Sequence, residues 1–255
     1  MPGKLELIPL EEFPRVLPGD DLTQLLAASL ERNQLTLCSG DVLVIAQKIV
    51  SKAEGRYVRL SDVTPSERAL AVAAEADKDP RQVELVLRES SEVLRVRPGV
   101  IIVEHRNGYV HANAGIDKSN IPNSKEDPQV LLLPLDSDES AQSIRQQLAA
   151  LGHIAPQIII NDSAGRAWRN GTVGIAIGTA GFSPLYNQIG EIDMFGNELE
   201  VTEAAVADEL AAAASLVMGQ AAEQCPVVLV RGASLQAAEV DSKSLLRDKS
   251  MDMFR

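Results

Sequence analysis

Three short apolar runs place the strongest constraint on the fold of this 255-residue chain. Val42–Ala46, Ile158–Ile160 and Val227–Val230 consist almost entirely of Val, Ile and Leu, and each is followed by polar or turn-forming residues. Apolar runs of this length and composition are typical of strands that are buried on both faces. The sequence therefore predicts that buried strands form the core of the fold.

The segments between these strands show helical patterns and one clear hairpin signal. Leucines at helical spacing in residues 22–30 follow Asp20 and Asp21, either of which can cap the start of a helix. Asn107–Gly108 is a two-residue hairpin signal between two strand-like segments. Because hairpins interrupt a simple alternation of strands and helices, we predict an α+β fold with mixed or antiparallel sheets and packed helices.

Two segments in the second half of the chain are rich in small residues. Gly171–Gly181 lacks the pattern of a phosphate-binding loop, so we interpret it as a strand in close backbone contact with its neighbours. Ala204–Gly219 is predicted to be the longest helix, with Thr202 as its N-cap and Gly219 as its stop signal. We expect one domain over residues 1–255, divisible into two interleaved lobes, with a polar tail or helix over 232–255.

Charge and composition exclude several classes of protein. The formal net charge is −12 and no block of Lys or Arg is present, which argues against nonspecific binding of nucleic acid or of an anionic membrane. No apolar run approaches the 18 residues of a membrane span, and Met1–Lys4 does not begin a signal peptide. Cys38 and Cys225 are too few for a disulfide framework. We therefore expect a cytoplasmic protein.

Two windows combine a carboxylate with other oxygen-bearing side chains directly after a predicted strand. Asp162 and Ser163 follow Ile158–Ile160, and Asp117 follows a small-residue turn after the hairpin. Oxygen ligands of this kind suit a hard divalent cation shared between two strand ends. Taken alone, the window at Asp162 is better explained by ordinary turn chemistry, with Arg166 and Arg169 as solvated charges, and the window at Asp117 has the same alternative explanation. The presence of both windows favours a site for a cation and a phosphate.

Lys48 and Lys52 follow the strand Val42–Ala46. One interpretation is that they contact a phosphate or a carboxylate, and the other is that the strand simply emerges into solvent, where Lys is common. His105 and His111 are interpreted as surface or core residues of strands, not as ligands.

Several short stretches together carry a resemblance to a known family. The matching stretches are Pro18–Leu22, Gly40–Val44, Val50–Arg56, Pro65–Arg68, Asn113–Asn120, Asn161–Arg166, Ala176–Gly178, Leu199–Thr202, Ala207–Glu209, Met218–Gly219 and Arg231–Gly232. In this order they resemble the coenzyme F420:γ-glutamyl ligase family over nearly the whole chain. Members of that family add L-glutamate to a deazaflavin coenzyme precursor at the expense of GTP. The resemblance also implies an interwoven, two-lobed α+β fold and a homodimer.

The resemblance implies roles for individual residues. Asp117 and Asp162 match metal-binding carboxylates, and Ser163 matches a hydroxyl ligand. Gln220 matches a metal ligand that is Glu in some members. The implied nucleotide contacts are Phe13, Pro14, Arg15, Val16, Gln47, Lys48, Lys52, Asn120, Met218, Gly219, Gln220, Ala221, Ala222, Glu223, Gln224 and Cys225. We expect Asp117, Asp162, Lys52 and Arg166 to carry catalysis, with Arg166 and Arg169 as candidates for phosphate or substrate-carboxylate contacts.

Two departures from the family pattern bear on these roles. Gln220 in place of Glu removes one negative charge, which should weaken a second metal. Gln47 and Lys48 replace small hydroxyl residues of some relatives, which bears on the phosphate contacts and on the choice of base.

The implied chemistry requires no protein nucleophile. Transfer of the GTP γ-phosphoryl group to a carboxylate gives an acyl phosphate, which the amine of glutamate attacks to form an amide. Such a reaction depends on positioning and on positive charge around the phosphates, and the expected ions are Mg or Mn, two in number, with K as a further ion. The alternatives are a related ligase acting on another carboxylate acceptor, and a nucleotide- or cofactor-binding homologue without catalysis.

Overall fold

The structure is a computed structural model that describes residues 3–253. The helices are α1 (Leu22–Arg32), α2 (Gln47–Ala53), α3 (Glu67–Ala76), α4 (Pro80–Arg88), α5 (Ser137–Ala150) and α6 (Val206–Met218). The strands are β1 (Glu6–Pro9), β2 (Val42–Ala46), β3 (Tyr57–Arg59), β4 (Ser90–Arg97), β5 (Val100–His105), β6 (Val110–Ala112), β7 (Gln129–Leu131), β8 (Gln157–Arg166), β9 (Arg169–Ala180), β10 (Tyr186–Asn187), β11 (Glu203–Ala204) and β12 (Val227–Arg231). Short 3₁₀ helices lie at Leu60–Asp62, Asn113–Gly115, Ser242–Leu245 and Lys249–Met251.

A five-stranded sheet in the order β1-β12-β2-β8-β9 forms the centre of the larger lobe. Strands β2 and β8 run parallel, whereas the other neighbours are antiparallel. The three apolar runs of the sequence are therefore adjacent strands β12, β2 and β8 of one mixed sheet. These pairings, together with the helices around them, confirm the predicted α+β class.

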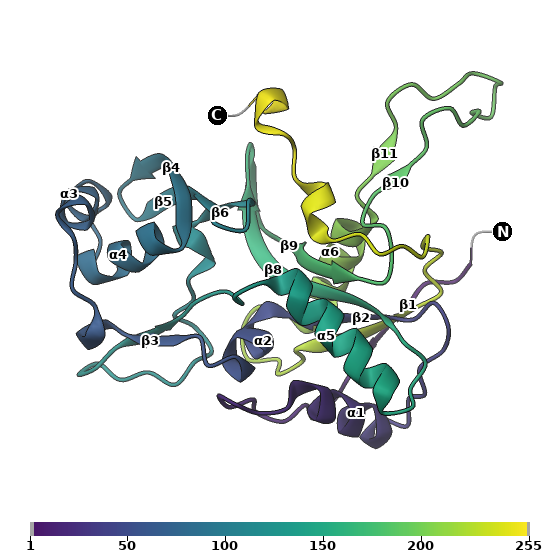
Figure 1. The fold of residues 1–255 in the computed structure, drawn as a ribbon, viewed down its shortest axis with the longest axis horizontal. Coiled ribbons are helices and arrows are strands. Elements are labelled where there is room, and N and C mark those ends of the chain that lie inside the picture. Colours follow the sequence, from purple (N-terminus) through teal and green to yellow (C-terminus); the bar gives the residue numbers. More distant parts are fainter. Residues whose placement is uncertain (1–2, 254–255) are drawn as a thin grey trace.

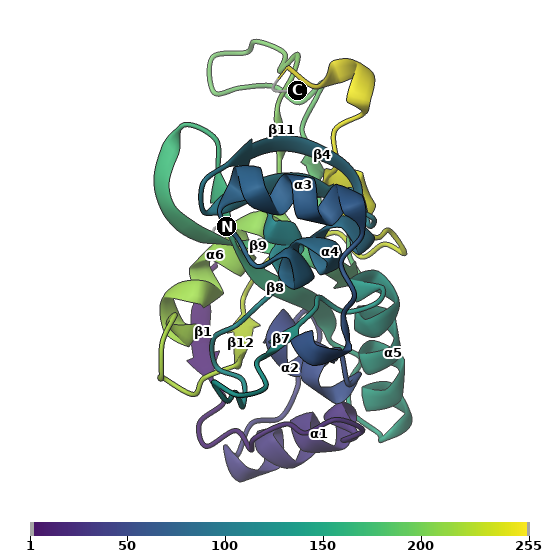
Figure 2. The ribbon, with the colours of Figure 1, turned by 90° about the vertical axis from the view of Figure 1, so that its left-hand side faces the viewer.

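Helices cover both faces of this sheet, which explains why its central strands are apolar without alternation. Leu43 and Ile45 of β2 point into the core formed with α1 and α5, whereas Val42 and Val44 point into the core under α6. The same division separates alternate residues of β8 and β12. In Figure 2, α5 and α6 lie on opposite sides of β8.

The smaller lobe contains α3, α4 and the three-stranded sheet β4-β5-β6, and it lies to one side of the large sheet (Figure 1). Its core is formed by small and β-branched residues such as Ala69, Ala73, Val83 and Val103. The loop Asn107–Gly108 joins β5 to β6 as predicted, with the amide of Gly108 donating to the carbonyl of His105. This lobe carries the segment that leads to Asp117.

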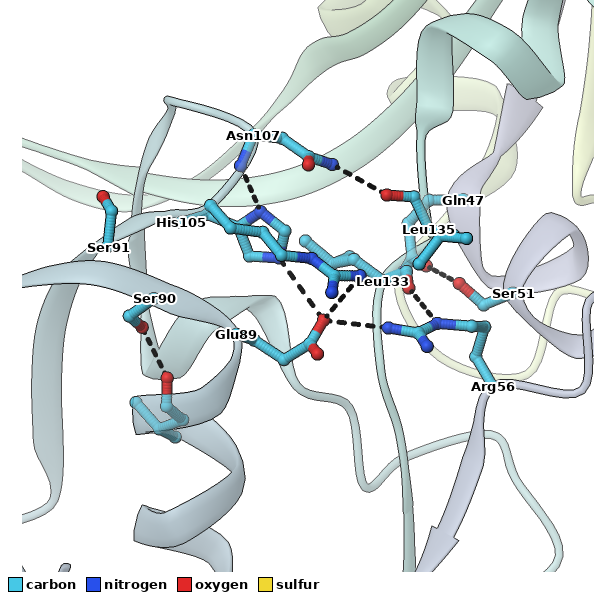
Figure 3. Close-up of polar contacts among 12 residues, drawn as sticks. Gln47, Ser51, Arg56, Glu89, Ser90, Ser91, His105, Asn107, Leu133 and Leu135 are labelled. Atoms are coloured by element: carbon cyan, nitrogen blue, oxygen red, sulfur yellow. Dashed lines mark hydrogen bonds and ion pairs between the residues drawn. The ribbon is translucent and has the colours of Figure 1, made fainter.

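A buried ion cluster joins the two lobes. Figure 3 shows Glu89, directly after α4, paired with the guanidinium group of Arg56. The guanidinium group of Arg106 pairs with the same carboxylate. The Glu89 carboxylate lies 2.8 Å from Arg56 Nη2 and 3.3 Å from Arg106 Nη2. Arg56 also donates to the carbonyl of Leu133. Because Arg56 directly precedes β3 and Glu89 belongs to the small lobe, this cluster ties the lobes together beside the site described below.

The glycine-rich segment is strand β9, as predicted, and it is packed against two helices. A Cβ at Gly178 would overlap the backbone carbonyl of Ser137 in α5, and one at Gly174 would overlap Ser215 of α6. Only glycine allows both helices to approach the strand this closely.

Two sequence-based expectations about helix α6 are wrong. It begins at Val206, because Glu203 and Ala204 pair with β10 as strand β11, so Thr202 is not its cap. With 13 residues it is also shorter than α5, which has 14. In the polar C-terminal segment, 3₁₀ helices form at Ser242–Leu245 and Lys249–Met251, where the side chains of Asp241 and Asp248 accept hydrogen bonds from backbone amides. Of the expected domain range 1–255 and tail 232–255, residues 1–2 and 254–255 lie outside the described part of the chain.

The turns between β10 and β11 extend away from the body of the molecule as a long arm (Figure 1). Within residues 3–253, no helix combines the length and apolar character needed to cross a membrane.

Candidate functional site

A cleft of about 760 Å³ lies where the carboxyl end of β2 and residues 161–163 of β8 meet the segment after β6. Residues that line it are Phe13, Pro14, Arg15, Val16, Leu17, Ala46, Gln47, Lys48, Ile49, Lys52, Tyr57, Asp117, Ser119, Asn120, Ile121, Pro122, Asn161, Asp162, Ser163, Ser215, Met218, Gly219, Gln220, Ala221, Ala222, Glu223, Gln224, Cys225 and Pro226. All the residues predicted to bind a nucleotide or a metal are in this set.

The parallel pairing of β2 with β8 brings the first polar residues together. Ala46 is in register with Asn161, so Gln47, which follows the end of β2, and Asp162, which continues β8, both lie where the parallel pairing of the two strands ends. The carboxyl end of a parallel strand is the usual position of binding sites in mixed α/β sheets. Gln47 begins helix α2, so Lys48 and Lys52 lie on a helix that lines the cleft.

Asp117 reaches the cleft from the small lobe. Its backbone forms an isolated bridge with Leu131, and its carboxylate accepts a hydrogen bond of 2.7 Å from Gln47 Nε2. Lys48 Nζ lies 3.3 Å from the other carboxylate oxygen. Burial and the nearby charge of Asp162 raise the pKa of Asp117, although Lys48 opposes this shift. The raised pKa indicates that a cation beyond Lys48 would be favourable here.

The orientation of the Gln47 amide is set from within α2. Ser51 Oγ donates a hydrogen bond of 2.9 Å to Gln47 Oε1, and both side chains are buried (Figure 3). With its oxygen engaged in this way, the amide presents its nitrogen to Asp117.

Asp162 lies inside strand β8, which corrects the expectation that the strand ends at Asn161. The register between β8 and β9 shifts between Ile160 and Asn161, and pairing then continues to Arg166. Such an irregularity changes the direction in which side chains point.

His111 of β6 contacts Asp162 from the small lobe. His111 Nε2 lies 2.8 Å from Asp162 Oδ2, and the geometry is that of an ion pair more than of a well-directed hydrogen bond. Burial would lower the pKa of His111, but the neighbouring carboxylate of Asp162 holds it above its ordinary value. The sequence analysis placed His111 in a strand but missed this contact, because a lone His in a strand gives no signal of a partner 51 positions away.

Ser163 and Gln220 meet across the cleft. Ser163 Oγ donates a hydrogen bond of 2.9 Å to Gln220 Oε1. Asn161 supports this wall, because its amide nitrogen donates to Ser215 Oγ of α6 at 3.0 Å. The end of α6 and the turn after it are thereby held beside β8.

Two lysines of α2 lie beside the loop that follows Asp117. Lys52 Nζ donates to the carbonyl of Asn120 at 2.8 Å, and Lys48 Nζ donates to that of Ser119 at 3.1 Å. Burial, Lys48 and Arg15 lower the pKa of Lys52, whereas Asp117 opposes this shift. A concentration of positive charge of this kind favours binding of an anion.

The loop after Asp117 also contacts the turn after α6. Asn120 Nδ2 donates to the carbonyl of Ala221 at 2.8 Å, and the amide of Ala221 donates to Glu223 at 2.7 Å. The predicted nucleotide contacts in residues 218–225 therefore form one wall of the cleft, and Asn120 bridges to it.

Arg166 is the predicted site residue that lies elsewhere. Its guanidinium donates to the carbonyl of Gly171 at 3.0 Å, within the β8–β9 hairpin, and it does not line the cleft. Strand β8 continues for three residues beyond Ser163, which places Arg166 about 10 Å farther along the strand. The expectation that Arg166 and Arg169 contact a phosphate in this cleft followed from the wrong strand end and is corrected here.

The donor set fits a hard divalent cation. Asp117, Asp162, Ser163 and Gln220 supply oxygen atoms to one cleft. Mg²⁺ and Mn²⁺ are commonly bound through one or two carboxylates, with phosphates and waters completing the shell. Among residues 3–253 there is no group of three or more His, Cys, Asp or Glu arranged to hold a metal by themselves. An ion here would therefore depend on ligands supplied by a bound phosphate.

The sequence is similar to those of known ligases over nearly its full length. Residues 11–232 match the family model described as F420-0:Gamma-glutamyl ligase. The chain is 46% identical over 253 residues to a protein of Methanothermobacter thermautotrophicus named coenzyme F420:L-glutamate ligase, covering 98% of this chain and 99% of that protein. Proteins with the same name from Methanopyrus kandleri and Methanocaldococcus jannaschii are 43% and 40% identical, each over 99% of this chain and 97% of the relative.

Proposed function

The chain belongs to the F420-0:Gamma-glutamyl ligase family, and from this membership we propose that it is a GTP-dependent ligase. Its proposed reaction adds L-glutamate to the carboxylate of a deazaflavin coenzyme F420 precursor. The products are an amide of the γ-glutamyl type, GDP and phosphate.

One observation supports the proposal above the others. Gln47, directly after β2, and Asp162, within the adjacent parallel strand β8, both line a cleft that also receives Asp117 from the other lobe. The same cleft contains Lys48 and Lys52. Two carboxylates for a cation and two ammonium groups for phosphates are the groups that transfer of a phosphoryl group needs. A volume of about 760 Å³ is ample for a nucleotide.

The proposed reaction has two steps. An oxygen of the precursor carboxylate attacks the γ-phosphorus of GTP, the bond from that phosphorus to the β–γ bridging oxygen breaks, and GDP leaves. The amine of glutamate then attacks the carbonyl carbon of the acyl phosphate, loses a proton, and expels phosphate as the amide forms.

The side chains of the cleft contribute through position and charge. Lys52, Lys48 and Arg15 would bind the triphosphate, and the wall formed by residues 218–225 would contact the nucleoside. The four oxygen donors described above would hold Mg or Mn ions, whose charge would stabilise the phosphates during transfer. Gln220, being neutral, should bind the second ion more weakly than Glu would.

We also propose a homodimer, as the family resemblance implies. The arm between β10 and β11 exposes large apolar side chains, with Met194 90%, Phe195 82% and Val201 84% exposed. Exposed apolar surface of this extent is typical of an interface. Sedimentation equilibrium would test this proposal, and a mass equal to one chain at micromolar concentration would contradict it.

The reaction itself is tested by mass spectrometry of the products. Purified protein is incubated with the deazaflavin precursor, L-glutamate, GTP and Mg or Mn, in K or in Na salts. The expected product is the precursor plus glutamyl residues, formed together with GDP and only when every substrate is present. Parallel reactions with ATP measure the choice of nucleotide.

Three outcomes would contradict parts of this proposal. Product formation with ATP but not with GTP would contradict the assignment of GTP as co-substrate. Ligation to a different carboxylate acceptor, with none to the deazaflavin, would indicate a related amide ligase. Binding of GTP without any release of GDP would indicate a homologue that has lost catalysis.

A further inference from the structure

Each carboxylate of the cleft contacts a nitrogen-bearing side chain: Asp117 contacts Lys48, and Asp162 contacts His111. The contact between His111 and Asp162 has no role in the mechanism above. His111 lies on β6 in the small lobe, and Asp162 lies on β8 of the large sheet. Their contact of 2.8 Å joins His111 Nε2 to Asp162 Oδ2. Both side chains are largely buried, with exposed fractions of 6% and 12%.

The imidazole is held at several points, so its position is well defined. Its other nitrogen, Nδ1, lies 3.2 Å from the carbonyl oxygen of Ala112. The ring of Tyr109 packs against it edge to face, with centroids 6.4 Å apart, and Tyr109 in turn stacks on His105 at 4.9 Å. His111 is therefore a rigid group in the wall behind Asp162.

The contact divides the two oxygens of Asp162. Oδ2 is buried from solvent and faces the imidazole, while the Asp162 side chain as a whole still lines the cleft. The remaining oxygen, Oδ1, is the one available to a ligand. Carboxylates that bind metals are commonly oriented by such an outer partner, and loss of the partner weakens metal binding about 10- to 100-fold.

We propose that His111 is a positioning residue that fixes Asp162 so that one carboxylate oxygen faces the cleft for a phosphate-bound divalent cation. This inference rests on the proposed function. Because β6 also leads into Asp117, the same contact sets the position of the second carboxylate relative to the first. Gln47 performs the corresponding task for Asp117 from α2.

The test measures Mn²⁺ binding directly, by electron paramagnetic resonance in the presence of GDP. His111→Phe retains the shape of the ring but loses the nitrogen, whereas His111→Gln retains a donor near the position of Nε2. Tyr109→Phe is the matched control, because it removes a buried hydroxyl from the same cluster but keeps the ring that packs against His111. Asp162→Asn is the reference for loss of the ion site.

We expect His111→Phe to bind Mn²⁺ at least about tenfold more weakly than wild type. His111→Gln should recover most of this loss, and Tyr109→Phe should match wild type. GDP binding measured without metal should be equal in wild type, His111→Phe, His111→Gln and Tyr109→Phe. If His111→Phe binds Mn²⁺ as tightly as wild type while Asp162→Asn does not, the proposed role of His111 is overturned but the metal assignment of Asp162 stands. Wild-type binding by Asp162→Asn would overturn the metal assignment of the proposed function, and this inference with it.

A second measurement uses the wild-type protein and does not depend on how the variants fold. The chain has three histidines, so the ring nitrogens are resolved readily by ¹⁵N NMR. Adding Mg²⁺ to the GDP complex should shift the ring signals of His111 and leave those of His153 unchanged. Unchanged signals of His111 at saturating Mg²⁺ would overturn the proposal.

Discussion

At the scale of single residues, the cleft is defined by a few charged groups that the fold holds close to one another. Asp117 is paired with Lys48, and Asp162 with His111, so each carboxylate is already oriented by a neighbour. Lys52 donates a hydrogen bond to the carbonyl of Asn120. Its charged form is disfavoured by burial and by the neighbouring positive charges of Lys48 and Arg15. A bound anion would accept charge-assisted hydrogen bonds from these ammonium groups in place of their present contacts, and each such bond would strengthen its binding.

Lys52→Met is expected to raise the KM for GTP about tenfold or more, which corresponds to about 1.4 kcal/mol of lost binding. The physical reason is that Lys52 is partly buried among cations and gains most from a triphosphate. Initial rates at varied GTP concentration provide the measurement. Lys118→Met is the matched control, because Lys118 follows Asp117 in the chain but does not line the cleft. Equal KM values for the two variants would contradict the assignment of Lys52.

At the scale of secondary-structure elements, two features hold the site in shape. Helices α5 and α6 pack on opposite faces of strand β9 and approach it closely at its glycines. This packing places the end of α6 beside Asp162. The ion cluster around Glu89 connects α4 with the segment that precedes β3, which places the small lobe against the sheet. Both features act on elements that carry site residues at their ends.

Gly178→Ala should reduce the free energy of unfolding by about 1–3 kcal/mol, because its Cβ would overlap the backbone of Ser137 and force β9 and α5 apart. Urea unfolding followed by circular dichroism measures the change. Gly165→Ala is the control in the same hairpin, since nothing lies within 4 Å of its Cβ position. The control should change stability by less than about 0.5 kcal/mol. A similar effect of both substitutions would rule out close packing as the reason for Gly178.

Glu89→Gln should lower the free energy of unfolding at neutral pH by about 2 kcal/mol, because two guanidinium groups lose their shared partner. Burial would raise the pKa of Glu89, but His105, Arg56 and Arg106 hold it below its ordinary value near 4.5. A carboxyl whose pKa is lowered by folding stabilises the folded state above its ordinary pKa, and this contribution is lost as the pH falls through the folded-state pKa.

The difference in stability between wild type and Glu89→Gln should therefore narrow as the pH is lowered from about 7 to below 4.5. Urea unfolding at a series of pH values provides the measurement. Glu75→Gln, an exposed Glu of α3, is the control and should show no such dependence. A constant difference across this range would show that the ion cluster does not depend on the charge of Glu89.

At the scale of the whole molecule, the cleft requires both lobes and at least five distant segments of the chain. Its lining includes residues 13–17, the start of α2, the segment after β6, residues 161–163 of β8 and the turn after α6. Such a cleft does not exist in the unfolded chain, so a ligand that fills it would bind only the folded state. The size of the resulting stabilisation follows from the ratio of ligand concentration to dissociation constant.

GTP together with Mn²⁺ should raise the melting temperature, and at 100 times the dissociation constant the stabilisation should be about 2.7 kcal/mol. Differential scanning calorimetry with GTP, with Mn²⁺ and with both separates the contributions. In Asp162→Asn, we expect the extra stabilisation by Mn²⁺ to be lost while the fold is retained. An effect of Mn²⁺ that is equal in wild type and in this variant would place the ion elsewhere.

The sequence by itself determined the parts of this protein that depend on local pattern. Apolar runs such as Val42–Ala46 predict buried strands because only burial on both faces removes so much apolar surface from water. Asp21 and Asp136 cap α1 and α5 in the structure, and they do so through side chains that lie next to the amides they bind. The residues that the resemblance implied for nucleotide and metal contacts all line one cleft, although other lining residues such as Tyr57 and Ile121 were not among them.

Only the tertiary structure decided how those residues meet. The continuation of β8 beyond Asp162 depends on pairing with β9, and the contact of Asp162 with His111 depends on how the small lobe packs against the sheet. Arg166 was assigned to the site because the strand was expected to end before it. A strand's length and a side chain's distant partner are set by contacts between segments far apart in the chain, and local residue patterns carry little information about those contacts.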